Sequence, residues 1–374
     1  GRINVPAGAD IVLDLNGHSI NRQLTTYTQL GSVLCVDGGK LTIEDGAGGG
    51  TITGGFTSEY DNWHPDELDY DYGGGIIMKS GELTINGGTV TGNRADCGGG
   101  ILVAGGKFTM NGGFVTNNIA DRASGGIEFD KRTDHVINGG EISYNQVTGV
   151  TASGTSVTGE GGGGIYIYGE CPEVTMNGGS IHHNKVDNCA GGGGVFVSPG
   201  VLFRMNGGEI CYNESNESDA AICLLWNGTN NINATGWTEL NGGLITGNIS
   251  KSQSQTGATT CTVANSMKIG GPIKIYDNYD GSGNQCNLFV IKASSLKITG
   301  PVVSEKGSAF IGISSILGNG SVLTSGFRAN GAFYNYSRDV ATIVFADSAS
   351  SRYVLDNGTE LVWRTGTTEY FDTD

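Results

Sequence analysis

The sequence predicts a right-handed parallel β-helix, a solenoid in which short strands stack coil upon coil. Three observations predict it: a nine-residue block recurs six times, a glycine-rich block alternates with it, and the composition favours strands and tight turns. Of 374 residues, 66 are Gly and only 6 are Pro, and charged residues make up 16%. Such abundant Gly without collagen triplets, beside many Ile, Val and Thr, indicates short strands joined by corners.

The first block reads as a hydrophobic residue, an NGG corner, a strand, and a second Asn seven residues after the first. Successive blocks lie 25, 27, 39, 29 and 35 residues apart, so one coil takes about 25 residues and the excess is inserted loop. Stacked Asn side chains can hydrogen-bond from coil to coil, and Asn tolerates left-handed backbone. We therefore assign these residues a structural role and no chemistry. The pairs are Asn86 and Asn93, Asn111 and Asn118, Asn138 and Asn145, Asn177 and Asn184, Asn206 and Asn213, and Asn241 and Asn248.

The second block is a glycine corner followed by a strand. Because alternate residues of a strand face opposite sides, the first hydrophobic residue after each corner is expected to point inward and fill a core shared by neighbouring coils. We predict about ten coils with inserted loops over residues 1–306, and terminal coils and a β cap over 307–374, packed as one continuous domain. The inward residues are expected to be Ile76, Ile101, Ile127, Ile165 and Val195.

Charge and cysteine content narrow the function classes. The net charge of −16 argues against a nucleic-acid partner and makes a polyanionic substrate awkward, so a neutral glycan fits better. The eight cysteines show no CxxC spacing, which argues against structural zinc, and we expect buried free thiols slightly ahead of disulfides. There is no apolar run of about 18 residues, so no membrane span is expected. No signal peptide is visible, and we expect the chain to be a mature part of a longer protein.

Function is expected where the repeat is broken, because the loops and outward positions of a solenoid are free to vary. Insertions occupy residues 56–72, 146–160 and 227–239. The first carries six acidic residues, Trp63 and three Tyr. Trp63, together with Trp226 just before the third insertion, is expected to add aromatic surface for a substrate.

The strand after the third glycine corner carries charge on its outward face. Glu128 and Asp130 are expected to lie side by side there, with Tyr166, Tyr168 and Phe196 one or two rungs along, and rungs are about 4.8 Å apart. Two carboxylates beside an aromatic shelf suit glycosidic cleavage, in which one acid protonates the leaving oxygen and the other acts as base or nucleophile. The spacing of about 6.6 Å along the strand is nearer the inverting than the retaining separation.

Other titratable residues lie near this pair or at the corners of the repeat. Asp96, Asp121 and Asp187 precede glycine corners, as is typical of turns, and Asp121 is kept as a third catalytic candidate because it would sit beside the same strand. The run FDKR at 129–132 is alternatively a surface ion-pair patch, with the rings packed under the inserted loops. His182 and His183 fall at corners and are expected to be surface residues, so we assign no metal site. No cofactor is expected to be required; calcium is left open without a motif to support it.

The alternation of GG-Ile/Val and xxN motifs resembles the β-helix repeats of secreted and surface-anchored bacterial proteins, including the polymorphic outer-membrane proteins. The opening VLDLNGHSI and the ending FADSASSRYVLDNGTELVW look like large gut-bacterial surface proteins of that type. The resemblance implies secretion or attachment to the cell surface, in a group that mixes adhesins with glycan-active enzymes. The β-helix lacto-N-biosidases are similar in composition and act on neutral host glycans. Their two catalytic aspartates lie seven apart, and the nearest equivalents here are Asp121 with Glu128 and Glu59 with Asp66.

Together these observations predict a secreted glycan-active protein, a glycoside hydrolase that cleaves neutral oligosaccharides with a carboxylate pair. A polysaccharide lyase is less supported because the chain is acidic and shows no basic cleft. The alternative is a non-catalytic surface adhesin or glycan-binding spacer, which explains the repeat, the charge and the loops equally well. In either case we expect a monomeric module of a larger protein.

Overall fold

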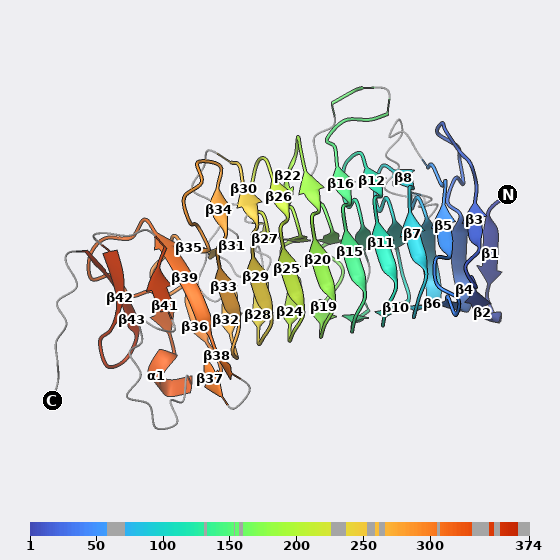
Figure 1. The fold of residues 1–374 in the computed structure, drawn as a ribbon. Coiled ribbons are helices and arrows are strands. Elements are labelled where there is room, and N and C mark those ends of the chain that lie inside the picture. The colour runs from blue at the N-terminus through green and yellow to red at the C-terminus, as the bar shows by residue number, and fades with distance from the viewer. Residues whose placement is uncertain are drawn as a thin grey trace.

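The computed structural model shows a parallel β-helix, with short strands stacked in register along one axis (Figure 1). The predicted fold class is confirmed. Among the described residues the only helix is α1 (Phe327–Asn330), which lies near the C-terminal end. No helix among the described residues is long and apolar enough to span a membrane. The structure describes residues 1–57, 72–130, 133–152, 154–156, 160–225, 237–252, 259–261, 266–304, 307–330, 344–347 and 352–365.

Each central coil places four strands in four columns, and each strand pairs in parallel with its equivalents one coil away. The column after the glycine corners contains β9 (Ile101–Val103), β13 (Ile127–Phe129), β18 (Ile165–Ile167), β23 (Val195–Val197), β27 (Ile222–Leu224), β31 (Thr259–Cys261) and β35 (Leu288–Val290). The column before the NGG corners contains β10 (Lys107–Met110), β14 (His135–Ile137), β19 (Glu173–Met176), β24 (Leu202–Met205), β28 (Trp237–Leu240), β32 (Met267–Ile269) and β36 (Leu296–Ile298).

The other two columns follow the NGG corners and the xxN corners. The column after the NGG corners contains β5 (Thr51–Thr53), β7 (Thr89–Thr91), β11 (Phe114–Thr116), β15 (Glu141–Ser143), β20 (Ser180–His182), β25 (Glu209–Cys211), β29 (Leu244–Thr246) and β33 (Lys274–Tyr276). The column after the xxN corners contains the shorter β8 (Arg94–Ala95), β12 (Ile119–Ala120), β16 (Gln146–Val147), β21 (Lys185–Val186), β26 (Glu214–Ser215), β30 (Ile249–Ser250) and β34 (Tyr279–Asp280).

The two ends of the stack depart from this pattern. At the N-terminal end the strands are β1 (Ile3–Pro6), β2 (Asp10–Asp14), β3 (Ser19–Asn21), β4 (Leu34–Glu44) and β6 (Ile76–Ile85), and β4 and β6 each span two columns. At the C-terminal end β39 (Phe310–Ser315), β40 (Thr324–Ser325) and β41 (Val344–Ala346) continue the parallel pairing beyond residue 306. An antiparallel hairpin of β42 (Arg352–Asp356) and β43 (Leu361–Thr365) follows. Short pairs are β17 (Glu160–Gly162) with β22 (Ala190–Gly192), and β37 (Val303–Ser304) with β38 (Gly307–Ser308).

The interior is a continuous hydrophobic core that runs the length of the solenoid. Ile127 aligns with Ile101 on one side and Ile165 on the other, and all three are fully buried. The predicted inward column is therefore confirmed. Seven of the eight cysteines have described side chains, and none of these seven forms a disulfide; Cys97 and Cys223 are partly exposed and the other five are buried.

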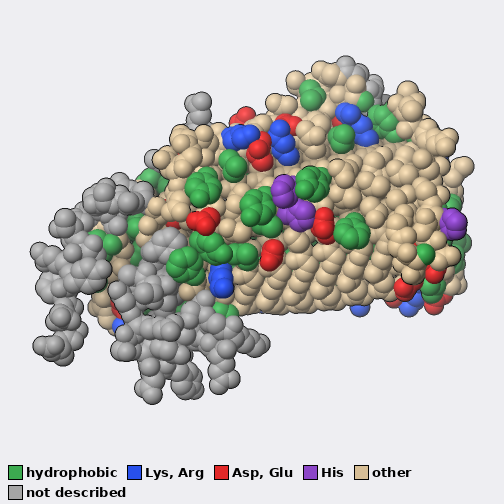
Figure 2. Space-filling model, viewed as in Figure 1, with side chains coloured by type: hydrophobic (Ala, Val, Ile, Leu, Met, Phe, Trp, Pro, Cys, Tyr) green, Lys and Arg blue, Asp and Glu red, His purple; other side chains and the backbone are tan. Residues whose placement is uncertain are grey.

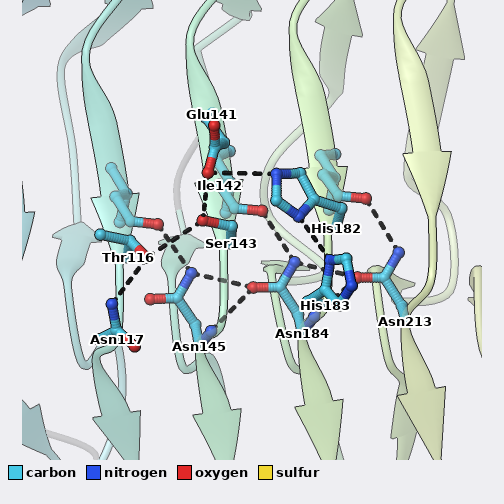
Figure 3. Close-up of polar contacts among 12 residues, drawn as sticks. Thr116, Asn117, Glu141, Ile142, Ser143, Asn145, His182, His183, Asn184 and Asn213 are labelled. Atoms are coloured by element: carbon cyan, nitrogen blue, oxygen red, sulfur yellow. Dashed lines mark hydrogen bonds and ion pairs between the residues drawn. The ribbon is translucent and has the colours of Figure 1, made fainter.

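The second Asn of each repeat is buried and forms an inner amide ladder. The backbone N–H and the Nδ2 of Asn145 both donate to Oδ1 of Asn184 at 3.0 Å, and Nδ2 also donates to the Val115 carbonyl at 2.8 Å (Figure 3). The same pair of bonds connects each successive coil from Asn93 to Asn287, and this last amide donates at 2.7 and 2.5 Å to the buried carboxylate of Asp347. The hydrogen-bonded ladder that the sequence predicts is confirmed. Its rungs are Asn93, Asn118, Asn145, Asn184, Asn213, Asn248, Asn278 and Asn287.

The left-handed corner lies one residue before the ladder, which corrects the reason expected for Asn there. Tyr144 and His183 have φ values of 53°, and neither Asn145 nor Asn184 is among the residues with positive φ. The ladder Asn is therefore selected for its buried amide, which satisfies backbone groups at the corner. At the NGG corners the second glycine takes positive φ, as Gly140 does at 87°, where a Cβ would also collide with the Gly113 carbonyl.

The first Asn of each repeat forms an outer, exposed ladder of opposite direction. Each Nδ2 donates to the Oδ1 of the preceding coil at 2.9 Å, from Asn241 back to Asn86. Asn86 in turn donates to Oε1 of Glu44 at 2.8 Å. Each ladder therefore ends on a carboxylate, at the end toward which the amide N–H groups of that ladder point.

We predict that the inner ladder stabilises the solenoid far more than the outer one. Asn184→Ala leaves buried hydrogen-bonding groups in two neighbouring coils without partners, and each such group costs about 1–3 kcal/mol. We therefore expect the free energy of unfolding to fall by about 3 kcal/mol or more. Asn177→Ala removes the same chemistry from an exposed position and should cost under about 1 kcal/mol. Urea unfolding of both variants checks this, and equal losses would contradict it.

Candidate functional site

Strand β13 places the two predicted carboxylates on the outside of the solenoid. Glu128 lies in register between Leu102 and Tyr166, and none of the three belongs to the inner core. The Asp130 N–H donates to the Val103 carbonyl at 3.0 Å, and the Tyr168 N–H donates to the Phe129 carbonyl at 2.8 Å. The ladder of backbone bonds thus brings Glu128 and Asp130 onto the predicted outward columns.

The two carboxyl groups form a closed pair. Their side chains are hydrogen-bonded to each other, which requires that Glu128 or Asp130 carry a proton. Burial, followed by the charge of Asp130, raises the pKa of Glu128 well above its ordinary value of 4.5. Glu128 is only 5% exposed, whereas Asp130 is partly exposed. Of the two carboxyl groups, Glu128 is therefore the one whose neutral form is favoured by burial.

The two side chains turn toward each other, which the backbone spacing of about 6.6 Å along the strand does not reveal. The remaining oxygen of Glu128, Oε2, is buried and has no hydrogen-bond partner among the residues that the structure describes.

A second buried acid, Asp96, stands close to the pair. Its charge raises the pKa of Glu128, and its Oδ1 lies 3.5 Å from Nε of Arg122. The Cys97 thiol donates to Asp96 Oδ2 at 3.6 Å, and burial raises the pKa of Cys97. The sequence pattern predicts only a turn role for Asp96. The sequence feature that could have pointed to Asp96 is its place before a glycine corner, which Asp121 shares.

Asp121 lies beside this cluster but is held by a cation. It is almost fully buried, and its Oδ1 lies 2.6 Å from Nη2 of Arg94. Burial raises the pKa of Asp121 to about 6 despite the opposing effect of Arg94. The Arg94 guanidinium lies 5.8 Å from the centre of the Phe56 ring. This pairing gives Asp121 a structural partner of its own, separate from the Glu128–Asp130 bond.

The predicted aromatic shelf is mostly buried. Tyr166 and Phe196 are 6% and 0% exposed, and their rings meet edge to face with centroids 5.2 Å apart. Together with Ala123 they form a small cluster outside the inner core. Tyr168 is 50% exposed and is the one of these three rings that reaches solvent. Trp63, Trp226 and the Lys131–Arg132 pair lie outside the described residues.

The two adjacent histidines lie on the face that Figure 2 shows, and Figure 3 shows their contacts. Nε2 of His182 lies 3.1 Å from Oε1 of Glu141, and its Nδ1 lies 2.8 Å from Nδ1 of His183. The Glu141 carboxylate accepts from Nε2, so in the neutral pair His182 Nδ1 accepts the hydrogen of His183 Nδ1. The described residues contain no group of three or more His, Cys, Asp or Glu arranged to hold a metal ion.

His183 is also part of an aromatic stack that the sequence analysis missed. Its ring stacks on Tyr144 with centroids 4.9 Å apart at 18°, and lies 5.3 Å from Tyr212 at 30°. All three occupy the left-handed corner position of successive coils. Because the rings cover one another's faces, they present mainly edges to solvent and stabilise the corners. In the sequence, the feature that these three residues share is their position immediately before the second Asn of the repeat.

Comparison with protein families, with curated proteins and with solved structures gives no match to this chain. The fold therefore defines the class, a parallel β-helix protein, and the side chains on its outer surface carry the argument for function.

The raised pKa of Glu128 predicts a pH-dependent stability. The folded chain keeps a proton that the unfolded chain releases above about pH 4.5, so stability falls as pH rises from there through the folded pKa. Glu128→Gln keeps the shape and removes the titration. Its melting temperature should match that of the wild type at pH 4 and exceed it at pH 8, because the variant does not lose the stability that the wild type loses as Glu128 titrates.

The matched control is Glu170→Gln, because Glu170 is exposed. Its difference from the wild type should be the same at both pH values. A Glu128→Gln variant that gains nothing at pH 8 would show that Glu128 is ionised in the folded protein.

Proposed function

We propose that this β-helix is a glycoside hydrolase that cleaves neutral oligosaccharides, with Glu128 as general acid and Asp130 as general base. The observation that supports it is the buried Glu128, whose pKa is raised well above its ordinary value by burial and by the neighbouring, partly exposed Asp130. Two neighbouring carboxyl groups with different environments, one kept neutral and one ionised, are what acid–base cleavage at neutral pH requires.

The proposed reaction follows from these two protonation states. Glu128 gives its proton to the glycosidic oxygen as the bond to the anomeric carbon breaks. Asp130 takes a proton from the water that attacks that carbon, so the sugar product carries the new hydroxyl. The direct hydrogen bond then returns the proton from Asp130 to Glu128 and restores the starting state. Inverting cleavage needs room for a water between the two carboxyl groups, so in this proposal substrate binding separates the two side chains.

The approach to the pair is through Asp130 and Tyr168. Asp130 is partly exposed, and Tyr168 occupies the next rung, about 4.8 Å away, with half of its side chain in solvent. An exposed ring gives the apolar face of a sugar a platform. The net charge of −16 repels uronate polymers and favours a neutral substrate. We further propose that the protein acts outside the cell, secreted or attached to the surface.

The second candidate is a glycan-binding adhesin without catalysis. The burial of Glu128 favours it, because Oε2 is shielded from solvent and only Asp130 and Tyr168 are open to a ligand. In that case the protonated pair is a structural contact, and a glycan binds without being cleaved.

We predict that sugars are released from neutral oligosaccharides or mucin glycans, and that each carboxyl variant abolishes this release. Glu128→Gln and Asp130→Asn should each lower kcat/KM by at least about 100-fold, the usual range for loss of a general acid or base. Tyr168→Ala should raise KM more than it lowers kcat, because its role is binding.

The control for this experiment is Glu170→Gln, an exposed carboxylate near the next rung, which should retain full activity. Activity that survives both carboxyl substitutions would overturn the assignment of the pair. Binding without product in the wild type would establish the adhesin in place of the hydrolase.

A further inference from the structure

The outer amide ladder ends before the last coils of the solenoid. Its last member is Asn241, because the next coil reads GGP at 270–272 where the earlier coils read NGG. Oδ1 of Asn241 lies in the space that a side chain on Gly270 would occupy. No described residue donates a hydrogen bond to that oxygen, although every earlier Asn of the ladder has its Oδ1 filled.

This oxygen is the acceptor end of a long polarised chain. Six amides point the same way, and Glu44 receives the N–H at the opposite end. Hydrogen bonds in such a series polarise one another, so the terminal carbonyl is a stronger acceptor than an isolated amide. The break in the repeat thus leaves an acceptor at the surface that needs an external donor.

A groove of about 730 Å³ opens at this point across three coils. Glu209, Leu244 and Lys274 are aligned on β25, β29 and β33 and line it, together with Asn241 and Tyr276. Tyr276 follows Lys274 by two residues and faces the same side of the strand. Its position is braced by an edge contact with Phe310, whose ring centroid lies 5.5 Å away. The volume is in the range of small-molecule sites.

The lining selects a neutral polyhydroxy ligand. Asn241 Oδ1 and the Glu209 carboxylate accept hydrogen bonds, Lys274 donates them, and Leu244 and Tyr276 supply apolar surface. One acid and one base leave the groove without net charge, and Figure 2 shows acidic and basic side chains interspersed over this face. An anionic ligand would meet two acceptors, whereas sugar hydroxyls can both donate and accept.

We propose that this groove is a saccharide-binding site, separate from the carboxyl pair. Glu128 lies on the column after the glycine corners, whereas the groove lies on the column after the NGG corners. The site rests on the proposed function for its ligand class and does not depend on cleavage. It holds a glycan chain against the solenoid, as a second point of attachment for a substrate or as the main one for an adhesin.

The test is calorimetric titration of the Glu128→Gln protein, in which cleavage is disabled, with neutral hexasaccharides of glucose, mannose and xylose and with a galacturonate hexamer. At least one neutral hexasaccharide should bind, and the galacturonate should bind at least tenfold more weakly. Adding Tyr276→Ala or Glu209→Gln should raise the Kd at least tenfold. The control Tyr144→Ala removes an exposed ring of the same face outside the groove and should leave the Kd unchanged.

The outcomes separate this site from the carboxyl pair. Binding that is lost with Tyr168→Ala but kept with Tyr276→Ala and Glu209→Gln places the sugar at the pair and overturns the groove. Absence of binding by every neutral hexasaccharide at millimolar concentration also overturns it. Binding that depends on Tyr276 and Glu209, in a protein that releases no sugar from any glycan, supports the groove while the hydrolase fails.

Discussion

The buried amide of one Asn in each coil is the constraint on which the rest of the structure depends. Its backbone and side-chain N–H groups donate to the amide oxygen of the ladder Asn in the next coil. Its own amide oxygen accepts from the corresponding N–H groups in the coil before. A buried polar group left without a partner costs about 1–3 kcal/mol, so a coil that slips or rotates loses several such bonds at once. The terminal coil meets this demand with Asp347, whose carboxylate accepts both donors of Asn287.

The fixed register is what turns a repeated sequence into aligned columns on the outer surface. It sets Glu128 beside Tyr166, stacks Tyr144 on His183, and brings Glu209, Leu244 and Lys274 onto one line. None of these side chains is needed by the ladder itself. The ladder therefore fixes where the outward side chains lie, and substitutions at these outward sites can introduce chemistry without disturbing the ladder.

The sequence was sufficient for those features that repeat. The spacing of Asn138 and Asn145 predicts a ladder, and the alternation in β13 predicts that Ile127 faces in and Glu128 faces out; both are confirmed. These follow because the same local rule is applied in every coil. Periodicity averages over many residues, so a single deviation does not obscure it.

Features that depend on side-chain direction or on covering segments could not be predicted. The convergence of Glu128 and Asp130 arises from rotation about side-chain bonds, which backbone spacing does not fix. Tyr166 is outward as predicted but buried, because exposure depends on what lies over a strand as well as on which way it faces. The groove is formed by three coils 30 or more residues apart in sequence, and its acceptor exists because Gly270 lacks a side chain.

We propose that glycan chemistry takes place where the outer face departs from the repeat. The most direct test is a crystal structure of the Glu128→Gln protein soaked with a neutral oligosaccharide that binds in solution. The account predicts a sugar ring against Tyr168, with a glycosidic oxygen beside residue 128 and Asp130 on the opposite side of the bond. A sugar bound elsewhere, with the pair still closed and Tyr168 free, would contradict the assignment of Glu128 and Asp130 to catalysis.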